Sequence, residues 1–465
     1  MVVPSSRSLS EARPAVFWSD RSDAPDARPA LVGSVDADLV VIGGGFSGLW
    51  AALHASEEPG RRVVLLDAER VGFGASSRNG GFCESSLTHG IENGMAQWPD
   101  ELATLVRLGA ENLAGLHRTV RDENIAAGVE SVGLMNVATQ QWQLDNIRGG
   151  FDAHHRYDES SELLDAAETR AVVDSPTYLG ARRSDGLLLV DPARLAWGLA
   201  EAAERRGVRV HDRSRVERVE TSGTGLVVRT RDGGTVRADR AIVATNAYRG
   251  PIRRPRRYVI PVYDYVLMTE PLTSDQMKAI RWSGREGVAD SANQFHYYRL
   301  TEDDRILWGG YDAVYHFGNK VDAGLEQRPA SHELLAAHFF ETFPQLEDLR
   351  FSHRWAGPIG TTSRFTATWG TSHDGRLAWV AGYTGLGVGA SRFGARVALD
   401  LVDGSETERT ALEMVRRKPF PFPPEPLRWI GVQLTSAAIA RADEHDGRRG
   451  RWLGLLDRFG IGFDS

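Results

Sequence analysis

At 465 residues, the chain is long enough for two or three domains, each built around a large core. Its apolar content of 42% and charged content of 25% are typical of a globular protein. The formal net charge of -7 is small for this length, so we expect no nucleic-acid partner. The single cysteine, Cys83, excludes an internal disulfide and any metal site built from several cysteines.

The sequence gives no sign of export or of a membrane span. The N-terminus has no basic region followed by an apolar core, and no apolar run approaches the ~20 residues that a membrane helix needs. We therefore expect a cytoplasmic protein. Residues 1–36 are rich in Ser, Pro, Arg and Asp and predict an irregular leader, with Phe17 and Trp18 anchoring it to the body of the protein.

A dinucleotide-binding fingerprint follows the leader. Residues 39–42 form an apolar run typical of a buried parallel strand, and they lead into Gly43, Gly45 and Gly48 at G-x-G-x-x-G spacing. The first glycine allows a tight turn, the second lets the backbone approach a pyrophosphate, and the third lets the next helix pack on the strand. A helix over residues 46–56 then points its free amides at the anion.

A second strand, residues 62–66, ends at Asp67, where an acidic side chain can accept a ribose hydroxyl. The offset of Asp67 from Gly48 matches the spacing of about 20 residues that this fingerprint requires. The fingerprint by itself fits FAD or NAD. Residues 72–81 favour FAD, because this second run of small residues contains hydroxyls, Arg78 and Asn79, which can reach a pyrophosphate and a flavin ring.

On these residues the chain resembles the D-amino-acid oxidase-like superfamily of FAD-dependent amine oxidoreductases. The form Gly74-Ala75-Ser76 with Arg78-Asn79-Gly80-Gly81 is most similar to its gamma-glutamylputrescine oxidoreductase branch. The resemblance implies an α/β plus α+β fold: a Rossmann-type FAD-binding domain, discontinuous in sequence, and an antiparallel-sheet substrate domain. We assign residues 37–98, 178–255 and 352–405 to the first domain, 99–177 and 256–351 to the second, and 406–465 to a C-terminal tail.

Segments far apart in the sequence are expected to complete the cofactor site. A strand over residues 240–246 ends in Thr245 and Asn246, and a strand, glycine turn and helix recur between residues 377 and 401. The second helix can stabilise electron density on the flavin with its N-terminus. With the resemblance, the residues predicted to bind FAD are Gly43, Gly45, Phe46, Ser47, Gly48, Asp67, Ala68, Gly74, Ala75, Ser76, Arg78, Asn79, Gly80, Gly81, Val216, Thr245, Asn246, Gly382, Tyr383, Gly385, Gly387 and Val388.

The superfamily implies oxidation of a C–N bond, in which a hydride passes from the amine to flavin N5 and an imine is hydrolysed. The expected substrate is a small primary or secondary amine, and the electron acceptor is oxygen or another oxidant. No zinc motif, nucleophile elbow or P-loop competes with this interpretation. The adjacent His154 and His155 read as surface residues of a polar helix.

Residues 258–308 are rich in aromatic side chains and predict strands around a substrate cavity. The candidates for the substrate site are Tyr263, Tyr265, His296, Tyr298, Arg299 and Trp355. Strand alternation means that some of these aromatic residues face away from the cavity.

Three departures from the resembled enzymes bear on chemistry. Ile359 and Gly385 stand where related amino-acid oxidases carry cationic residues for a substrate carboxylate, which favours an amine unless Arg299 or Arg354 supplies the clamp. Trp308 stands near the position of a lysine that promotes reaction with oxygen. No cysteine lies near Trp355 to attach FAD, so we predict noncovalent FAD.

Two alternatives remain at this level. One is an amino-acid, sarcosine or glycine-type oxidase. The other is a flavin-binding assembly factor that keeps the fold without turnover. Reduction of the flavin by amines separates the second from both enzymes.

Overall fold

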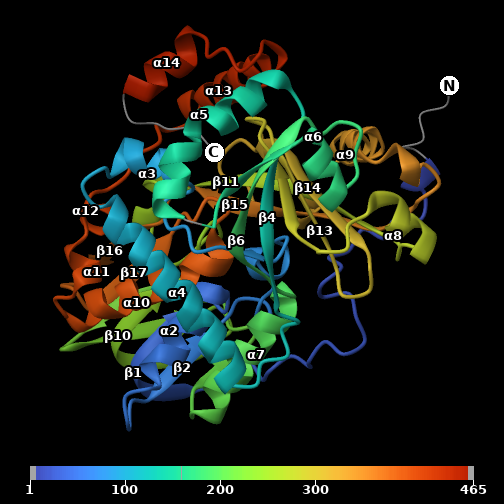
Figure 1. The fold of residues 1–465 in the computed structure, drawn as a ribbon. Helices are drawn as coiled ribbons and strands as arrows, with labels where there is room; N and C mark the ends of the chain where they lie inside the picture. The colour runs from blue at the N-terminus through green and yellow to red at the C-terminus, as the bar shows by residue number, and fades with distance from the viewer. Residues whose placement is uncertain (1–6, 159, 459–465) are drawn as a thin grey trace.

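The fold, seen in a computed structural model that describes residues 7–158 and 160–458, is organised by two sheets (Figure 1). The first is an eight-stranded sheet whose main path runs β16-β17-β10-β1-β2-β7, with β9 beside β10 and β8 beside β9. Its parallel strands are β1 (Ser34–Ile42), β2 (Val63–Leu66), β7 (Arg209–His211), β10 (Thr235–Val243) and β17 (Leu377–Ala381). Its antiparallel strands are β8 (Val216–Ser222), β9 (Gly225–Thr230) and β16 (Thr368–Ser372).

Apolar residues cover both faces of this sheet, as a buried parallel sheet requires. On one face Leu39, Val41 and Leu65 pack in a core with three helices. These helices are α2 (Phe46–Ala55), α7 (Pro192–Arg205) and α10 (Gly387–Asp403), and α4 (Leu102–Asp122) packs on α10. On the other face Val40, Ile42 and Val64 pack in a second core with apolar residues of β8, β9 and β10.

The start of α7 is set by its first residues. Asp191 caps the helix by accepting a hydrogen bond from the Arg194 amide at 3.0 Å, and Pro192 occupies the first turn. Arg21 also pairs with Asp191 at 2.7 Å, so the leader is fastened to this helix. Trp18 of the leader is buried as well, and its ring N–H donates to the carbonyl of Asn79 at 2.9 Å.

The second sheet has nine strands in the order β15-β11-β14-β13-β12-β4-β6-β3, with β5 beside β6. Neighbours are antiparallel except for β12 and β4. The strands are β3 (Phe82–Cys83), β4 (Glu130–Ala138), β5 (Glu162–Asp165), β6 (Gly180–Leu189), β11 (Ile260–Thr269), β12 (Gly287–Asp290), β13 (His296–Leu300), β14 (Ile306–Tyr315) and β15 (Phe351–Thr361). Helix α9 (Pro329–Thr342) covers β11 and β14 on the face away from the first sheet and completes an aromatic core there.

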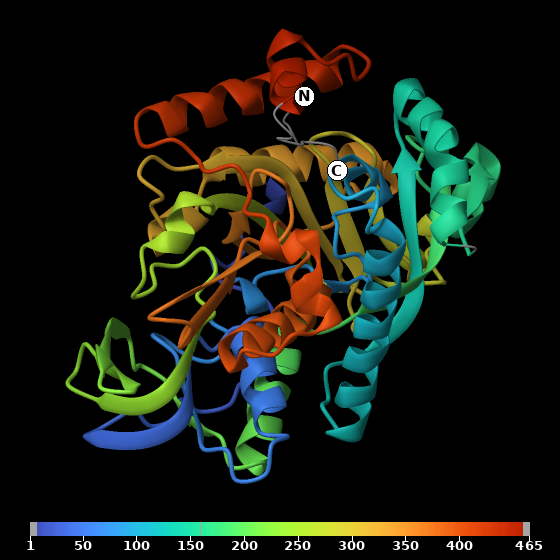
Figure 2. The same ribbon diagram turned by 90° about the vertical axis from the view of Figure 1, so that its left-hand side faces the viewer.

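Shorter helices surround the two sheets. They are α3 (Ile91–Gln97), α5 (Gln141–Tyr157), α6 (Ala166–Val172), α8 (Ser274–Ile280), α11 (Glu408–Ala411), α12 (Glu413–Arg416), α13 (Leu427–Glu444) and α14 (Arg451–Arg458), with 3-10 turns η1 (Ala75–Ser77), η2 (Arg254–Arg257), η3 (Ala323–Glu326) and η4 (Pro344–Leu346). Figure 2 shows α13 lying across the top of the molecule, above the second sheet. Within the described part of the chain, every helix is too short or too polar to cross a membrane.

The predicted segment boundaries differ from the sheets. Strands β3 and β6, and all of β15 except its first residue, lie inside the segments 37–98, 178–255 and 352–405 that we assigned to the cofactor domain, yet all three strands belong to the second sheet. The chain crosses to the first sheet after Val190 and again after β15. Buried strands of the two sheets have similar composition, so their residues alone do not show which sheet they join.

Candidate functional site

One cavity of about 2030 Å³ lies between the two sheets. Its walls come from the ends of β1, β2 and β10, the loop after β2, the first turn of α10, and strands β4, β6, β11 and β15. Residues of α5 and α13 close its far side. The predicted tail of residues 406–465 therefore contributes to the cavity, which its sequence did not indicate.

The glycine turn between β1 and α2 forms one wall. Gly43 has a φ of +112°, and a Cβ there would lie 2.7 Å from the Ala244 carbonyl oxygen. A Cβ on Gly48 would lie 1.8 Å from the Gly43 oxygen, so only glycine lets α2 approach the strand. The N-cap residue of α2 is Gly45, which has no side chain to cap the helix, and the Phe46 amide donates to Ser76 Oγ at 2.9 Å. The first turn of α2 thus presents amides toward the cavity.

Asp67 stands at the end of β2, at the opposite edge of this turn. Its carboxylate accepts hydrogen bonds from the Gly44 amide at 2.6 Å and the Glu69 amide at 2.7 Å. Burial nevertheless raises the pKa of Asp67 to about 6. A ribose hydroxyl would add a donor to this carboxylate and favour its charged form.

The loop that follows Asp67 is held in one shape by internal bonds. Asn79 donates from its side-chain amide to the carbonyls of Ala75 and Ser76, each at 3.0 Å, and accepts from the Gly81 amide at 2.8 Å. The Trp355 ring N–H donates to the Arg78 carbonyl at 2.9 Å. The backbone of the loop is therefore set before any ligand binds.

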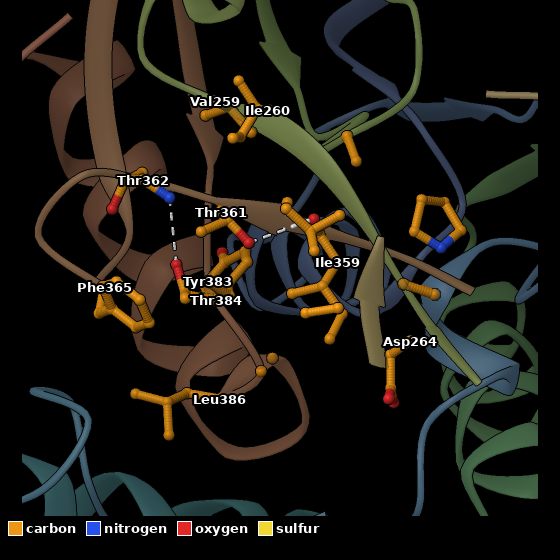
Figure 3. Close-up of a pocket in the computed structure, with 18 of the residues that line it drawn as sticks. Val259, Ile260, Asp264, Ile359, Thr361, Thr362, Phe365, Tyr383, Thr384 and Leu386 are labelled. Carbon is orange, nitrogen blue, oxygen red and sulfur yellow. Dashed lines mark hydrogen bonds between the residues drawn. The ribbon is translucent and has the colours of Figure 1, made fainter. Parts of the chain in front are cut away.

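The far end of the sequence closes the same cavity. The side-chain oxygen of Asn246, after β10, accepts the Gly382 amide at 2.8 Å. Thr384 Oγ1 accepts the Thr362 amide at 3.2 Å, which places the turn before α10 beside the end of β15 (Figure 3). Ser47 of α2 donates to the Tyr383 hydroxyl at 2.8 Å. Both glycine turns thus meet, and the first turn of α10 opens toward the cavity.

The structure brings the predicted FAD-binding residues together. All of them line the cavity except Gly48, Gly81 and Gly382, which lie behind its wall. A Cβ on Gly81 would lie 2.2 Å from the Val190 oxygen, and one on Gly382 would lie 2.3 Å from Thr362 Cγ2. These three glycines permit close packing of the wall.

The six predicted substrate-site residues all lie outside the cavity wall, so that prediction is wrong as regards their position. Tyr263 and Tyr265 are buried on the opposite face of β11, where their hydroxyls donate to the carbonyls of Asp322 at 3.2 Å and Leu325 at 2.9 Å. Tyr298 bonds the Tyr178 hydroxyl at 2.6 Å within the aromatic core.

The other three candidates also have structural partners. His296 Nδ1 bonds Asp290 at 2.7 Å, and its Nε2 bonds His338 at 3.0 Å. Arg299 donates to the Val190 carbonyl at 2.9 Å, and Trp355 holds the Arg78 loop. The tyrosines and His296 face α9 because the sheet buries its larger apolar face there, whereas Trp355 packs against Trp18 on the other face.

Asp264 and Tyr297 are the residues that this alternation brings into the cavity. The Tyr297 hydroxyl donates to Asp264 Oδ2 at 2.5 Å. Burial raises the pKa of Asp264 to about 6, against the hydrogen bond from Tyr297, which lowers it. A Cβ on Gly80 would lie 2.7 Å from the Tyr297 ring, so the pair stands beside the loop of Arg78 and Asn79. Figure 3 shows Asp264 on the strand next to Ile359.

Asp264 was not predicted from the sequence, because the aromatic residues on either side of it were selected instead. The signal was present in the alternation of Tyr263, Asp264 and Tyr265, since adjacent residues of a strand face opposite sides. Ile359 lines the cavity as expected. Arg299, Arg354 and Trp308 lie outside the wall, so neither arginine supplies the alternative carboxylate clamp.

A second group of ionisable side chains lines the cavity on β6, on α5 and on the segment from the end of β3 into α3. Its members are Glu84, His89, Glu92, His154 and Arg182. His154 is buried and bonds Glu92, so the expectation of a surface histidine is wrong. His154 was predicted to be exposed because its neighbours in α5 are polar, but one side of α5 faces the cavity.

Comparison with known proteins agrees with this architecture. Residues 38–401 match the model of the DAO family, described as FAD dependent oxidoreductase. The chain is 32% identical over 434 residues to gamma-glutamylputrescine oxidoreductase of Escherichia coli, covering 92% of this chain and 94% of the relative. This chain belongs to the DAO family of FAD-dependent oxidoreductases. A probable oxidoreductase of Haemophilus influenzae is 27% identical, with 85% of this chain and 90% of the relative covered.

Solved structures show the same fold. Glycine oxidase of Geobacillus kaustophilus superposes with a TM-score of 0.68 at 20% identity, over 82% of this chain and 99% of that one. Iminodiacetate oxidase of Chelativorans sp. BNC1 gives 0.65 at 19% identity, over 82% and 98%.

The site fits the cofactor of the family. The open amides of α2 and the Asp67 carboxylate suit a pyrophosphate and a ribose, and the turn before α10 completes the wall some three hundred residues later. Ligand pockets commonly measure about 300–1,000 Å³, so a cavity of about 2030 Å³ has room for a dinucleotide and a further molecule.

Proposed function

We propose that this enzyme oxidises the C–N bond of a small primary or secondary amine. The observation that supports the proposal is that a single cavity extends from the glycine turn between β1 and α2, and the turn before α10, to the Asp264–Tyr297 pair. FAD, when bound, supplies the two-electron acceptor for such an oxidation. The amine loses a hydride from its α-carbon and a proton from its nitrogen, and the resulting imine is hydrolysed to a carbonyl compound and an amine or ammonia.

The cofactor would be held by the residues around the glycine turn between β1 and α2. Asp67 would accept a ribose hydroxyl, and the first turn of α2 would bind the pyrophosphate through its amides. We propose that FAD is held noncovalently. Cys83 is buried in the core between the first sheet and its helices, and burial raises the pKa of its thiol far above the usual range, so a reactive thiolate is disfavoured.

Asp264 and Tyr297 would orient the amine. The Asp264 carboxylate attracts an incoming ammonium group, and its raised pKa of about 6 makes it a stronger proton acceptor than an ordinary aspartate. The apolar neighbours Ile359, Val262 and Phe82 exclude water from this part of the cavity and thereby favour the uncharged amine.

The names of the relatives support this class of substrate. One relative is named for gamma-glutamylputrescine, an amine donor, while structural neighbours are named for glycine and iminodiacetate. All three compounds carry a carbon–nitrogen bond next to an oxidisable carbon, so we propose a C–N donor for this chain as well.

An anaerobic titration tests the proposal. The purified holoenzyme is mixed without oxygen with a panel of primary amines, secondary amines and amino acids, and the flavin absorbance near 450 nm is followed, which reports reduction without assuming the electron acceptor. We expect at least one primary or secondary amine to bleach the flavin. Reduction by glycine or sarcosine alone would support an amino-acid oxidase. A flavin that no compound reduces would support a binding role without turnover.

A further inference from the structure

The cavity wall formed by β4, β6 and α5 contains an arginine that the proposed chemistry does not use. Arg182 lies on β6, opposite Asn136 on β4, and both side chains line the cavity. One guanidinium nitrogen of Arg182 donates to the side-chain oxygen of Asn136 at 2.8 Å. Since Asn136 is fixed as an acceptor in this bond, its amide nitrogen remains a donor. The two side chains therefore form a wall rich in N–H groups.

Arg182 has no carboxylate partner among residues 7–158 and 160–458 within 4.0 Å. Its neighbour Arg183, on the opposite face of β6, pairs with Glu162 at 3.3 Å and Glu286 at 3.2 Å. Burial lowers the pKa of the Arg182 guanidinium. A desolvated guanidinium without an ion pair is costly, and an anionic ligand would offset that cost.

The nearby carboxyl groups are either bonded to another side chain or made less acidic by burial. Burial opposes the charge of Glu92, but the hydrogen bond with His154 on α5 lowers the pKa of its carboxyl, so Glu92 is a carboxylate bonded to His154. Glu84 faces the same wall, and burial raises the pKa of its carboxyl, which reduces the negative charge that an anion would meet. Asp158 also contributes to the potential at Arg182 but lies outside the cavity wall. The guanidinium is thus a positively charged group that this wall presents to an anion, while the Glu92 carboxylate is bonded to His154.

We propose that Arg182 and Asn136 bind a carboxylate group of the substrate, so that the enzyme selects amines whose carboxylate is remote from the oxidised carbon. The inference rests on the proposed amine oxidation. A planar carboxylate matches the paired N–H groups of a guanidinium, which makes arginine a better partner for it than a point charge.

The remoteness follows from sheet topology. Between β6, which carries Arg182, and β11, which carries Asp264, lie the strands β4, β12, β13 and β14. Five strand-to-strand steps therefore separate the two strands along the sheet. Curvature shortens the direct path, but the two side chains remain on different walls. A carboxylate on the oxidised carbon itself would not reach both.

The test compares Arg182→Gln, Arg182→Lys and wild type, with Arg183→Gln as a matched control on the other face of the same strand. Glutamine keeps a donor for Asn136, and flavin content and thermal melting check folding. The first readout is equilibrium binding of pentanoate to the holoenzyme, by calorimetry. We expect R182Q to weaken binding about 10- to 100-fold, R182K to fall between R182Q and wild type, and R183Q to match wild type. Equal pentanoate affinity in R182Q and wild type would overturn the proposal.

The second readout is anaerobic flavin reduction by a series of ω-aminocarboxylates and by alkylamines of equal length. In wild type we expect the longer ω-aminocarboxylates to bind more tightly than the matching alkylamines, and R182Q to remove that advantage while leaving the alkylamines unchanged. A loss that is equal for both series would contradict a carboxylate site. If no amine reduces the flavin, the proposed function fails, while the pentanoate measurement still decides whether Arg182 binds a carboxylate.

Discussion

The two sides of the cavity differ in how directly the sequence specifies them. On the cofactor side, glycines at fixed spacing enforce a backbone path, and the residues predicted there line one wall or pack directly behind it. On the substrate side, strands carry large residues on one face and smaller or polar ones on the other. Four of the six residues predicted there, Tyr263, Tyr265, His296 and Tyr298, face the aromatic core, while Arg299 and Trp355 pack against Trp18 of the leader. A motif that constrains the backbone can be located from sequence, whereas the direction of a strand's side chains depends on what packs against each face.

Replacement of Gly48 tests the cofactor side most severely. We expect Gly48→Ala to weaken FAD binding more than 100-fold, because the added Cβ would lie 1.8 Å from the Gly43 oxygen and force α2 away from β1. Gly454→Ala in α14, where a Cβ meets nothing within 4 Å, is the control. Flavin fluorescence during titration of the apoprotein measures both. Near-normal affinity in G48A would show that the turn tolerates displacement.

Replacement of Asp264 tests the substrate side. We expect Asp264→Asn to lower the second-order rate of anaerobic flavin reduction by an amine about 10- to 100-fold at pH 8, since charged hydrogen bonds contribute roughly that factor. The pKa of Asp264 is raised to about 6, so its carboxylate is protonated as the pH falls below that value. The ratio of wild-type to variant rate should therefore shrink toward one below pH 6. A ratio that is independent of pH would remove Asp264 from amine binding.

The sequence predicted the family, the cofactor and the wall around it because those features depend on local constraints. The alternation of buried runs and glycines locates β1, β2 and β10, and Asp191 with Pro192 locates the start of α7. Membership of β3, β6 and β15 in the second sheet could not be predicted, because pairing with strands elsewhere in the chain decides it. The sequence did not indicate a role for Arg182 for the same reason, since only the pairing of β4 with β6 places it beside Asn136.

A milder test of the cofactor side is Asp67→Asn. Asparagine keeps an acceptor for the Gly44 amide but removes the charge offered to a ribose hydroxyl, so we expect the dissociation constant of FAD to rise about 10-fold. Because the pKa of Asp67 is raised to about 6, FAD affinity of the wild type should also fall as the pH drops through that value. The variant should lack this dependence. Asp36→Asn, at an exposed position on β1, is the control, and calorimetric titration with FAD at several pH values measures the difference.

The smallest expected effect concerns a residue that the sequence placed in the substrate site. Tyr298→Phe removes the hydroxyl that bonds Tyr178 at 2.6 Å inside the aromatic core, on the face turned away from the cavity. We expect the free energy of unfolding to fall by about 1–2 kcal/mol, as for the loss of one buried hydrogen bond, while anaerobic flavin reduction by an amine stays within twofold of wild type. Chemical denaturation and stopped-flow absorbance measure the two quantities. A large loss of reduction rate without a change in stability would return Tyr298 to the substrate site, and the contrast between the two faces of the sheet would then no longer hold.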